Sequence, residues 1–247
     1  MRTVEIVLDD KKDYFTREAF NTLRTNILFS GRDVKTILIT SCIAHEGKST
    51  ISFETALNLA EAGKKVLLID ADLRKSVFAN RYTKKKGLLG LSQYLSGQAD
   101  RDDVLYETQI PNFSIIFSGP FPPNPTELVG NEAFGELIRS VRDSYDYVLV
   151  DVPPLGMVID AAVMAPSCDG AVLVINTGVI KYRLAQRVAD QLRKSGCRIL
   201  GVVLNQASRK AGRNGKGKYY KSYYSYQGQS GAETTDANPK KEKKSAK

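Results

Sequence analysis

The chain has 247 residues, a formal net charge of +9 and an apolar fraction of 42%, which suffices for one α/β domain with length to spare. It contains no apolar run of the roughly 20 residues that span a bilayer, and its first residues do not have the pattern of a signal peptide. Three widely separated cysteines, Cys42, Cys168 and Cys197, lack metal-ligand spacing and predict reduced thiols. We therefore expect a cytoplasmic protein.

The positive charge is concentrated at the C-terminal end. Residues 206–247 contain 11 Lys and Arg against 3 Asp and Glu, whereas residues 1–205 contain 25 against 24. The part of the chain that can build a core is therefore nearly neutral. The overall basicity does not predict a nucleic-acid-binding domain, and we expect no nucleic acid as a partner.

In chain order, residues 1–31 predict a short extended segment and then a helix with one apolar face (Phe20, Leu23, Ile27 and Leu28). Short apolar runs predict buried strands at 36–41, 66–70, 113–117, 147–151, 171–175 and 199–204. Amphipathic stretches predict helices at 50–62, 88–95, 131–143, 159–165 and 181–194. Apolar strands that alternate with helices predict an α/β fold, in which a mostly parallel sheet is covered by helices on both faces.

The apolar pattern stops after Leu204. Residues 206–247 are rich in Gly, Lys, Ser and Tyr and show no apolar periodicity. This composition predicts a disordered C-terminal tail and not a second domain.

The stretch Glu46-Gly47-Lys48-Ser49-Thr50 lies between a predicted strand and a predicted helix, as the second half of a P-loop does. In a P-loop, backbone amides hold phosphate oxygens, the Lys reaches the β- and γ-phosphates, and the Ser hydroxyl binds Mg²⁺. Cys42 replaces the first glycine of the usual pattern, and His45 stands where glycine is common. Because His tolerates the left-handed backbone region better than most residues, the loop remains possible. We expect ATP and Mg²⁺ as ligands.

Carboxylates follow two of the predicted strands. Asp70 and Asp72 follow the strand at 66–70, and Asp151 ends the strand at 147–151. Ligands of parallel sheets bind beyond the carboxyl ends of the strands, and Mg²⁺ prefers oxygen ligands. Each Asp alone is more often a cap or turn residue. Together beside a P-loop, they predict a Mg²⁺–nucleotide site in which Ser49 and Asp151 bind the metal.

The three motifs together resemble Walker A, Walker A′ and Walker B of the bacterial tyrosine kinases (BY-kinases) of capsule and exopolysaccharide gene clusters. They are Gly47-Lys48-Ser49-Thr50, Asp70-Ala-Asp72-Leu-Arg74 and Asp151-Val-Pro153-Pro154. The segment from Glu18 to Arg24 resembles the family's Glu-x-x-Arg-x-x-Arg oligomerisation helix, with Asn21 in place of the middle Arg. Five tyrosines resemble the family's C-terminal tyrosine cluster: Tyr219, Tyr220, Tyr223, Tyr224 and Tyr226.

The resemblance implies a P-loop NTPase-like, ATP-dependent protein-tyrosine kinase. Such a kinase autophosphorylates its tyrosine cluster and regulates capsular or exopolysaccharide synthesis and chain length. It implies an oligomerisation segment (1–31), a kinase domain (32–205) and a basic tyrosine-rich tail (206–247). The expected partners are a transmembrane activator (a polysaccharide copolymerase), a cognate protein-tyrosine phosphatase and further copies of the chain. The protein would lie on the inner face of the cell membrane through its partner.

The resemblance also implies roles for single residues. Lys48 contacts the β/γ-phosphates, and Thr50 lies near the α-phosphate. Asp72 holds metal-bound water and Asp70 accepts the tyrosine proton, a division that rests on the resemblance alone. Asn205, after the last strand, contacts the adenine or serves as a turn residue. Glu18 and Arg24 are the expected oligomer contacts.

Three alternatives remain open at this stage. A septum-site or plasmid-partition ATPase shares the architecture, but usually has a signature Lys where this chain has Ile43. A non-catalytic, ATP-dependent scaffold in polysaccharide export would keep the P-loop without kinase activity. The basic, tyrosine-rich tail could also stack single-stranded nucleic acid, although a tail that serves as kinase substrate explains the clustered tyrosines better.

Overall fold

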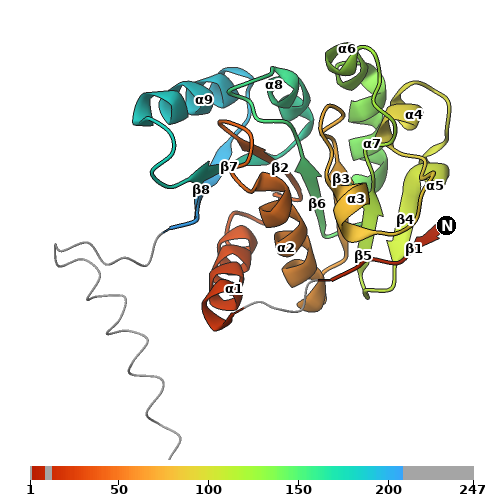
Figure 1. The fold of residues 1–247 in the computed structure, drawn as a ribbon, viewed down its shortest axis with the longest axis horizontal. Coiled ribbons are helices and arrows are strands. Elements are labelled where there is room, and N and C mark those ends of the chain that lie inside the picture. Colours follow the sequence, from red (N-terminus) through yellow and green to blue (C-terminus); the bar gives the residue numbers. More distant parts are fainter. Residues whose placement is uncertain (1, 9–12, 208–247) are drawn as a thin grey trace, which may run out of the picture. The chain divides into compact units, whose positions relative to one another are not determined.

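The structure, a computed structural model, describes residues 2–8 and 13–207. An eight-stranded sheet runs through these residues in the order β1-β4-β5-β3-β6-β2-β7-β8 (Figure 1). All neighbouring strands are parallel except β4 and β5. The strands are β1 (Arg2–Val4), β2 (Thr36–Ser41), β3 (Val66–Asp70), β4 (Leu105–Thr108), β5 (Phe113–Ile116), β6 (Tyr147–Asp151), β7 (Gly170–Asn176) and β8 (Ile199–Asn205). The prediction of a mostly parallel sheet is confirmed.

The six predicted strands are present, each within one residue of its expected bounds at either end. Strands β2, β3, β5 and β6 are buried at every position, which explains their continuous apolar sequences. Strand β1 lies within the predicted extended segment. Strand β4, which we did not predict, is short, and its last two residues are exposed or half-buried. It pairs antiparallel with β5 at the side of the sheet where β1 lies.

Helices cover both faces of the sheet, as predicted (Figure 1). Side chains of α1, α2 and α3 pack in one apolar cluster with one face, and those of α4, α7, α8 and α9 pack in a second cluster with the other face. The helices are α1 (Tyr14–Leu28), α2 (Lys48–Glu61), α3 (Phe78–Tyr82), α4 (Leu91–Leu95), α5 (Arg101–Val104), α6 (Pro125–Val129), α7 (Glu132–Arg142), α8 (Asp160–Met164) and α9 (Tyr182–Lys194). No helix within the described residues is long and apolar enough to cross a membrane.

The N-terminal segment packs on the same sheet as the rest of the described chain. Val4 and Ile6 are buried, and the Gln109 side chain pairs with the backbone amide and carbonyl of Ile6 at 2.8 and 2.6 Å. On α1, Ile27 is buried as predicted, but Leu28 is 38% exposed, so the expected apolar face is narrower.

The described chain ends shortly after β8. The backbone carbonyl of Gln206 accepts a hydrogen bond from the Thr177 hydroxyl at 3.0 Å, and its side chain accepts one from Asn176 at 3.0 Å. The first residue of the expected tail therefore still contacts the sheet edge. The part of that tail beyond Ala207, residues 208–247, lies outside the described residues.

Candidate active site

The motifs meet at the carboxyl edge of the central strands. Strand β2 leads into the loop before α2, and the ends of the neighbouring strands β3 and β6 carry carboxylates. Asp70 and Asp151 are register partners in the β3–β6 pair. The parallel arrangement thus brings together residues that are about 80 positions apart in the sequence.

The loop from Cys42 to Gly47 adopts a backbone that suits its unusual sequence. His45 has φ = 65° and Gly47 has φ = 86°, both in the left-handed region. The expectation that His45 tolerates this region is confirmed. A Cβ atom on Gly47 would lie 2.2 Å from Nδ2 of Asn205. The positive φ angle and the close approach of Asn205 therefore both favour glycine at position 47.

Glu46 supports the loop from beneath. Its buried carboxylate accepts hydrogen bonds from the amides of Cys42 at 2.7 Å, Ile43 at 2.8 Å and Asn176 at 3.0 Å. Burial and the Glu46 carboxylate raise the pKa of the Cys42 thiol to about 12, so it stays neutral. The Glu46 side chain thus shapes the loop, and a contact of Glu46 with ATP stays a prediction.

Asn205 also contacts the loop. Its Nδ2 donates to the Glu46 carbonyl oxygen at 2.9 Å, and its Oδ1 accepts from the Gln206 amide at 2.9 Å. Both polar atoms of the Asn205 side chain therefore form hydrogen bonds with backbone groups, as expected if Asn205 serves as a turn residue. A contact of Asn205 with adenine stays a prediction.

Lys48 lies between two carboxylates. Its Nζ is 3.0 Å from Oδ2 of Asp151 and 3.1 Å from Oδ2 of Asp72. Burial opposes the charged form of Lys48, but these carboxylates outweigh it and raise its pKa. Oδ2 of Asp151 also accepts from the Ser49 hydroxyl at 2.7 Å, and its Oδ1 accepts from the Ser52 hydroxyl at 2.7 Å. Sequence motifs did not include Ser52; its position one helical turn after Lys48 was the available signal.

The Asp72 carboxylate is held in a fixed direction by its own loop. Its Oδ1 accepts from the backbone amides of Arg74 at 3.3 Å and Lys75 at 3.0 Å, which leaves Oδ2 facing Lys48. The Arg74 side chain pairs with buried Asp160, with Nε 2.8 Å from Oδ2. This ion pair fastens the loop to the start of α8.

Asp70 lies deeper than Asp72. It is 0% exposed, and its Oδ2 accepts hydrogen bonds from the Ser76 hydroxyl and from the Ser118 amide at 3.3 Å. Its Oδ1 has no hydrogen-bond partner among the described residues. Burial, with a smaller contribution from Asp151, raises its pKa to about 7. A buried carboxyl of this kind has the proton affinity of a general base, but it does not line the cleft.

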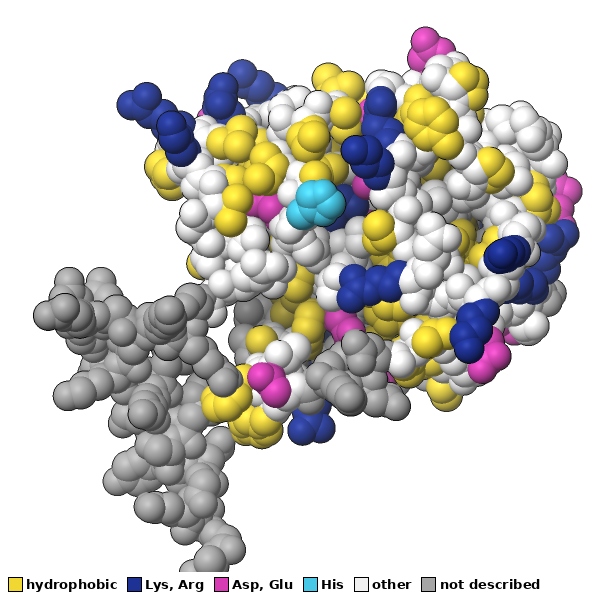
Figure 2. Space-filling model, viewed as in Figure 1, with side chains coloured by type: hydrophobic (Ala, Val, Ile, Leu, Met, Phe, Trp, Pro, Cys, Tyr) yellow, Lys and Arg dark blue, Asp and Glu magenta, His cyan; other side chains and the backbone are white. Residues whose placement is uncertain are grey.

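A cleft of about 540 Å³ lies over the loop and is lined by Lys48, Ser49, Thr50 and Asp72. Basic side chains surround it, including Arg74, Lys75 and Arg81. Figure 2 shows Lys and Arg side chains near the single histidine on this face of the molecule. A cleft with backbone amides, several cations and the Asp72 carboxylate suits a polyphosphate with its metal ion.

The donor set fits Mg²⁺. Among the described residues, no group of three or more His, Cys, Asp and Glu side chains could hold a metal by itself. Ser49, Asp72 and Asp151 offer only oxygen atoms, and their hydroxyl and carboxylate oxygens already converge around a cation, the Lys48 ammonium. Mg²⁺ commonly binds one or two carboxylates together with substrate phosphates and water.

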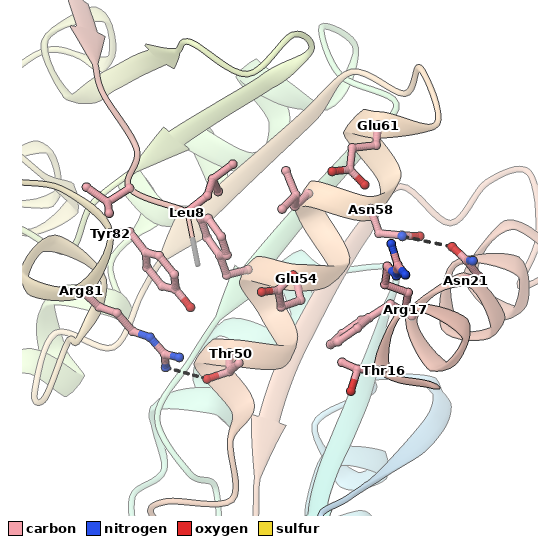
Figure 3. Close-up of a pocket in the computed structure, with 14 residues that line it drawn as sticks. Leu8, Thr16, Arg17, Asn21, Thr50, Glu54, Asn58, Glu61, Arg81 and Tyr82 are labelled. Atoms are coloured by element: carbon pink, nitrogen blue, oxygen red, sulfur yellow. Dashed lines mark hydrogen bonds between the residues drawn. The ribbon is translucent and has the colours of Figure 1, made fainter. Parts of the chain in front are cut away.

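A second cavity of about 770 Å³ lies between α1, α2 and the N-terminal segment (Figure 3). Thr50 and Arg81 line both this groove and the cleft.

The groove wall contains the predicted oligomerisation helix. The Asn21 side chain accepts a hydrogen bond from Asn58 of α2 at 3.2 Å (Figure 3). Glu18 accepts one from Asn21 at 3.0 Å, and Arg24 donates one to the Asn58 carbonyl at 3.4 Å. Glu18 and Arg24 are thus apart from the cleft, and their oligomer contacts stay a prediction. The five predicted acceptor tyrosines lie outside the described residues.

A parallel sheet whose strand turns through Gly47-Lys48-Ser49 into a helix, beside the acidic end of β6, defines a P-loop nucleotide-binding protein. The AAA domain family matches residues 34–179. Tyrosine-protein kinase CpsD of Streptococcus agalactiae is 45% identical over 193 residues, which cover 78% of this chain and 83% of the relative.

Two solved structures are similar in fold and sequence. The kinase domain of the Escherichia coli tyrosine kinase ETK has a TM-score of 0.75 and 28% identity, covering 86% of this chain and 91% of that one. The septum site-determining protein MinD of Pyrococcus horikoshii, complexed with Mg-ADP, has a TM-score of 0.62 and 28% identity, covering 72% of each chain. This chain belongs to the bacterial tyrosine kinases, and it is a nucleotide-binding protein-tyrosine kinase.

Proposed function

We propose that this kinase transfers the γ-phosphoryl group of ATP to its own C-terminal tyrosines and thereby regulates capsular or exopolysaccharide synthesis and chain length. Self-labelling is supported by the position at which the described chain leaves the sheet, which is next to the P-loop. Asn205 bonds to the P-loop backbone at 2.9 Å, and Tyr219 follows 14 residues later. That length spans about 21 Å as a flexible coil and up to roughly 50 Å when extended, so a tyrosine can reach a P-loop.

Phosphoryl transfer depends mainly on positioning and charge stabilisation. In our proposal, Lys48 binds the β/γ-phosphates and Thr50 lies near the α-phosphate, as their places at the start of α2 support. Ser49 and Asp151 would hold Mg²⁺, and Asp72 would hold a water molecule of its shell. The bound metal would neutralise negative charge on the phosphates.

The acceptor phenol has a pKa of about 10, so its proton needs an acceptor. We assign this role to Asp70, whose raised pKa suits it. Because Asp70 is fully buried, the loop of residues 71–77 must open for it to meet the phenol. Asp72, which lines the cleft, is the competing acceptor.

The resemblance to capsule kinases supports the wider proposal. We propose a transmembrane activator of the polysaccharide copolymerase type and a cognate protein-tyrosine phosphatase as partners. We also propose a homo-oligomer that uses Glu18 and Arg24. The kinase would act in the cytoplasm, on the inner face of the membrane, through its activator.

The septum-site ATPase alternative shares the fold, as the similarity to MinD illustrates. It is disfavoured by Ile43, which stands five residues before Lys48 where those ATPases usually have a signature Lys. The scaffold alternative would bind ATP without modifying tyrosine.

The test is mass spectrometry of the purified full chain after incubation with ATP and Mg²⁺. We expect phosphotyrosine within residues 219–226, and none when Lys48→Ala is treated identically. Nucleotide turnover without phosphotyrosine on the chain would instead support an ATPase, and nucleotide binding with neither product would support a scaffold.

A further inference from the structure

Arg81 lies beside the P-loop helix, although it belongs to no motif of the sequence. It is on α3, the five-residue helix that follows the Asp70–Asp72 segment. Its Nη1 donates a hydrogen bond of 2.8 Å to Oγ1 of Thr50 (Figure 3). The pair lies where the nucleotide cleft meets the groove between α1 and α2.

Aromatic packing holds this arginine in position. The guanidinium carbon is 5.2 Å from the centre of the Tyr82 ring, a cation–π distance. That ring is stacked on Phe53 of α2, with centroids 3.8 Å apart and planes 12° from parallel. Phe53 is 1% exposed, so the stack is anchored in the core. Arg81 is therefore fastened to the same helix that carries Lys48 and Ser49.

Arg81 differs from Lys48 and Arg74, two other cations that line the cleft, in its ion pairing. Lys48 pairs with Asp72 and Asp151, and Arg74 pairs with Asp160. No carboxylate of the described residues forms an ion pair with Arg81. A held guanidinium with unused N–H donors is a ready partner for a phosphate group.

The position of Thr50 indicates which phosphate group lies near Arg81. Thr50 is the third residue of α2, and the amides at a helix N-terminus attract phosphate oxygens. Its Oγ1 accepts from Arg81, so its own O–H can serve as a donor, either to the neighbouring Tyr82 hydroxyl or to a bound phosphate oxygen. Arg81 and Thr50 therefore offer donors from neighbouring points on one side of the cleft.

We propose that Arg81 is a nucleotide-binding residue that contacts the α-phosphate together with Thr50, whose hydroxyl it orients. It sets the affinity for nucleoside di- and triphosphates and not the rate of phosphoryl transfer. This inference rests on the proposed assignment of Thr50 to the α-phosphate. It adds a residue from α3 to a site that the motifs place on β2, β3, β6 and α2.

The test is calorimetric titration of the full chain with ADP and with ATP, each with Mg²⁺. For Arg81→Gln we expect the Kd of both nucleotides to rise by about tenfold and by the same factor, because both carry the α-phosphate. The KM for ATP rises similarly, while kcat at saturating ATP stays within about twofold. Arg81→Lys keeps the charge and the contact with the ring but lacks the planar fork, so it recovers only part of the affinity.

Two controls separate a contact with nucleotide from general effects. Lys86→Gln removes one exposed positive charge five residues away, outside the cleft, and should change neither Kd. Thr50→Val removes the hydroxyl acceptor. The double variant with Arg81→Gln should bind little more weakly than Arg81→Gln alone, whereas fully additive losses would contradict the orienting role of Arg81.

Unchanged Kd values in Arg81→Gln, with normal binding by the wild type, overturn the Arg81 proposal alone. A loss restricted to ATP would place Arg81 at the γ-phosphate and also overturn it. A wild-type chain that binds neither nucleotide overturns the proposed function as well. If Arg81→Gln melts at a lower temperature, Arg81→Lys decides the case: native melting with weakened nucleotide binding supports the contact, and native binding refutes it.

Discussion

Lys48 forms an ion pair within the folded protein, with Asp151, and is also the residue that we expect to bind the phosphates of ATP. The Asp151 side chain is 0% exposed and relies on the ammonium group 3.0 Å away, together with two serine hydroxyls. A phosphate group that binds Lys48 must therefore compete with carboxylates for it. At the scale of single residues, the nucleotide site is a cluster of buried charges, and a change to one member affects the others.

We predict that Lys48→Ala abolishes tyrosine phosphorylation and also lowers stability. Removing one partner of a buried ion pair leaves Asp151 uncompensated, which costs about 3 kcal/mol, or roughly 6–12 °C in melting temperature. Calorimetry and phosphotyrosine analysis of the same sample measure both effects. A wild-type melting temperature would contradict the role of Lys48 as counter-ion, and wild-type labelling would contradict the P-loop assignment.

Asp70→Asn should reduce autophosphorylation by at least about 100-fold and change the Kd of ATP by less than about twofold. The amide cannot accept the phenol proton, and Asp70 does not line the cleft. Asp72→Asn is the comparison, since it faces Lys48 and should weaken nucleotide binding. If Asp70→Asn loses both properties in equal measure, Asp70 serves the metal site. If it retains transfer while Asp72→Asn does not, the proton acceptor is Asp72.

At the scale of elements, the fully buried strands were predictable, and several short helices in the connections between strands were not. The strands at 36–41, 66–70 and 147–151 have the expected bounds because both faces are buried, which requires an unbroken apolar run. Helices α4 and α8 are short, but they lie inside the longer amphipathic stretches at 88–95 and 159–165. Helices α3, α5 and α6 have four or five residues, too few for a helical period to show. For this reason the motifs placed Lys48, Ser49, Asp72 and Asp151 correctly at one edge, while Arg81 on α3 was missed.

The burial of Asp70 and the engagement of Asn205 could not be predicted either. Both residues follow strands at the ligand edge, and the sequence pattern makes no distinction between a side chain on the cleft wall and one beneath it. The difference arises from tertiary contacts, since Ser76 and Ser118 enclose Asp70 and the loop backbone binds Asn205.

Asp169 joins the starts of β2 and β7 at the opposite edge of the sheet. Its carboxylate accepts from the amides of Lys35 at 2.9 Å and Thr36 at 2.7 Å and pairs with Arg142. Burial alone would raise its pKa, but these hydrogen bonds, led by that of Arg142, outweigh burial and lower it below 3.8. The folded state therefore favours the carboxylate.

From this shift we predict a stabilising effect that is present above about pH 4 and is lost as the pH falls through the lowered pKa. At neutral pH, Asp169→Asn should lower the free energy of unfolding by about 1–3 kcal/mol. The difference between variant and wild type should shrink as the pH is lowered towards 3, as urea denaturation at several pH values can measure. A difference that does not change with pH would show that Asp169 acts through packing and not through its charge.

At the scale of the whole molecule, the chain combines a nearly neutral catalytic part with a basic end. Truncation should be made after Ala207, because Gln206 still bonds to Asn176 and Thr177. We predict that a chain of residues 1–207 keeps its melting temperature within about 2 °C and its ATP affinity within about twofold, but shows no self-labelling. Wild-type labelling of the shortened chain would move the acceptor tyrosines into residues 1–207. A large fall in melting temperature would show that residues 208–247 contribute packing.

The charge of residues 206–247 predicts how labelling affects assembly. Each phosphotyrosine adds about −1.5 to −2 charges at neutral pH, so five of them add roughly −7.5 to −10 to a segment with 11 Lys and Arg against 3 Asp and Glu. A segment that binds an acidic site of a neighbouring copy or an anionic membrane when unmodified should therefore dissociate as label accumulates, and a phosphatase should restore binding. Light scattering at matched concentration should give a smaller mass for the phosphorylated sample, and the difference should shrink at high salt because charges are screened. Equal masses at every salt concentration would exclude a charge-driven switch, and tighter membrane binding by the phosphorylated chain would reverse its sign.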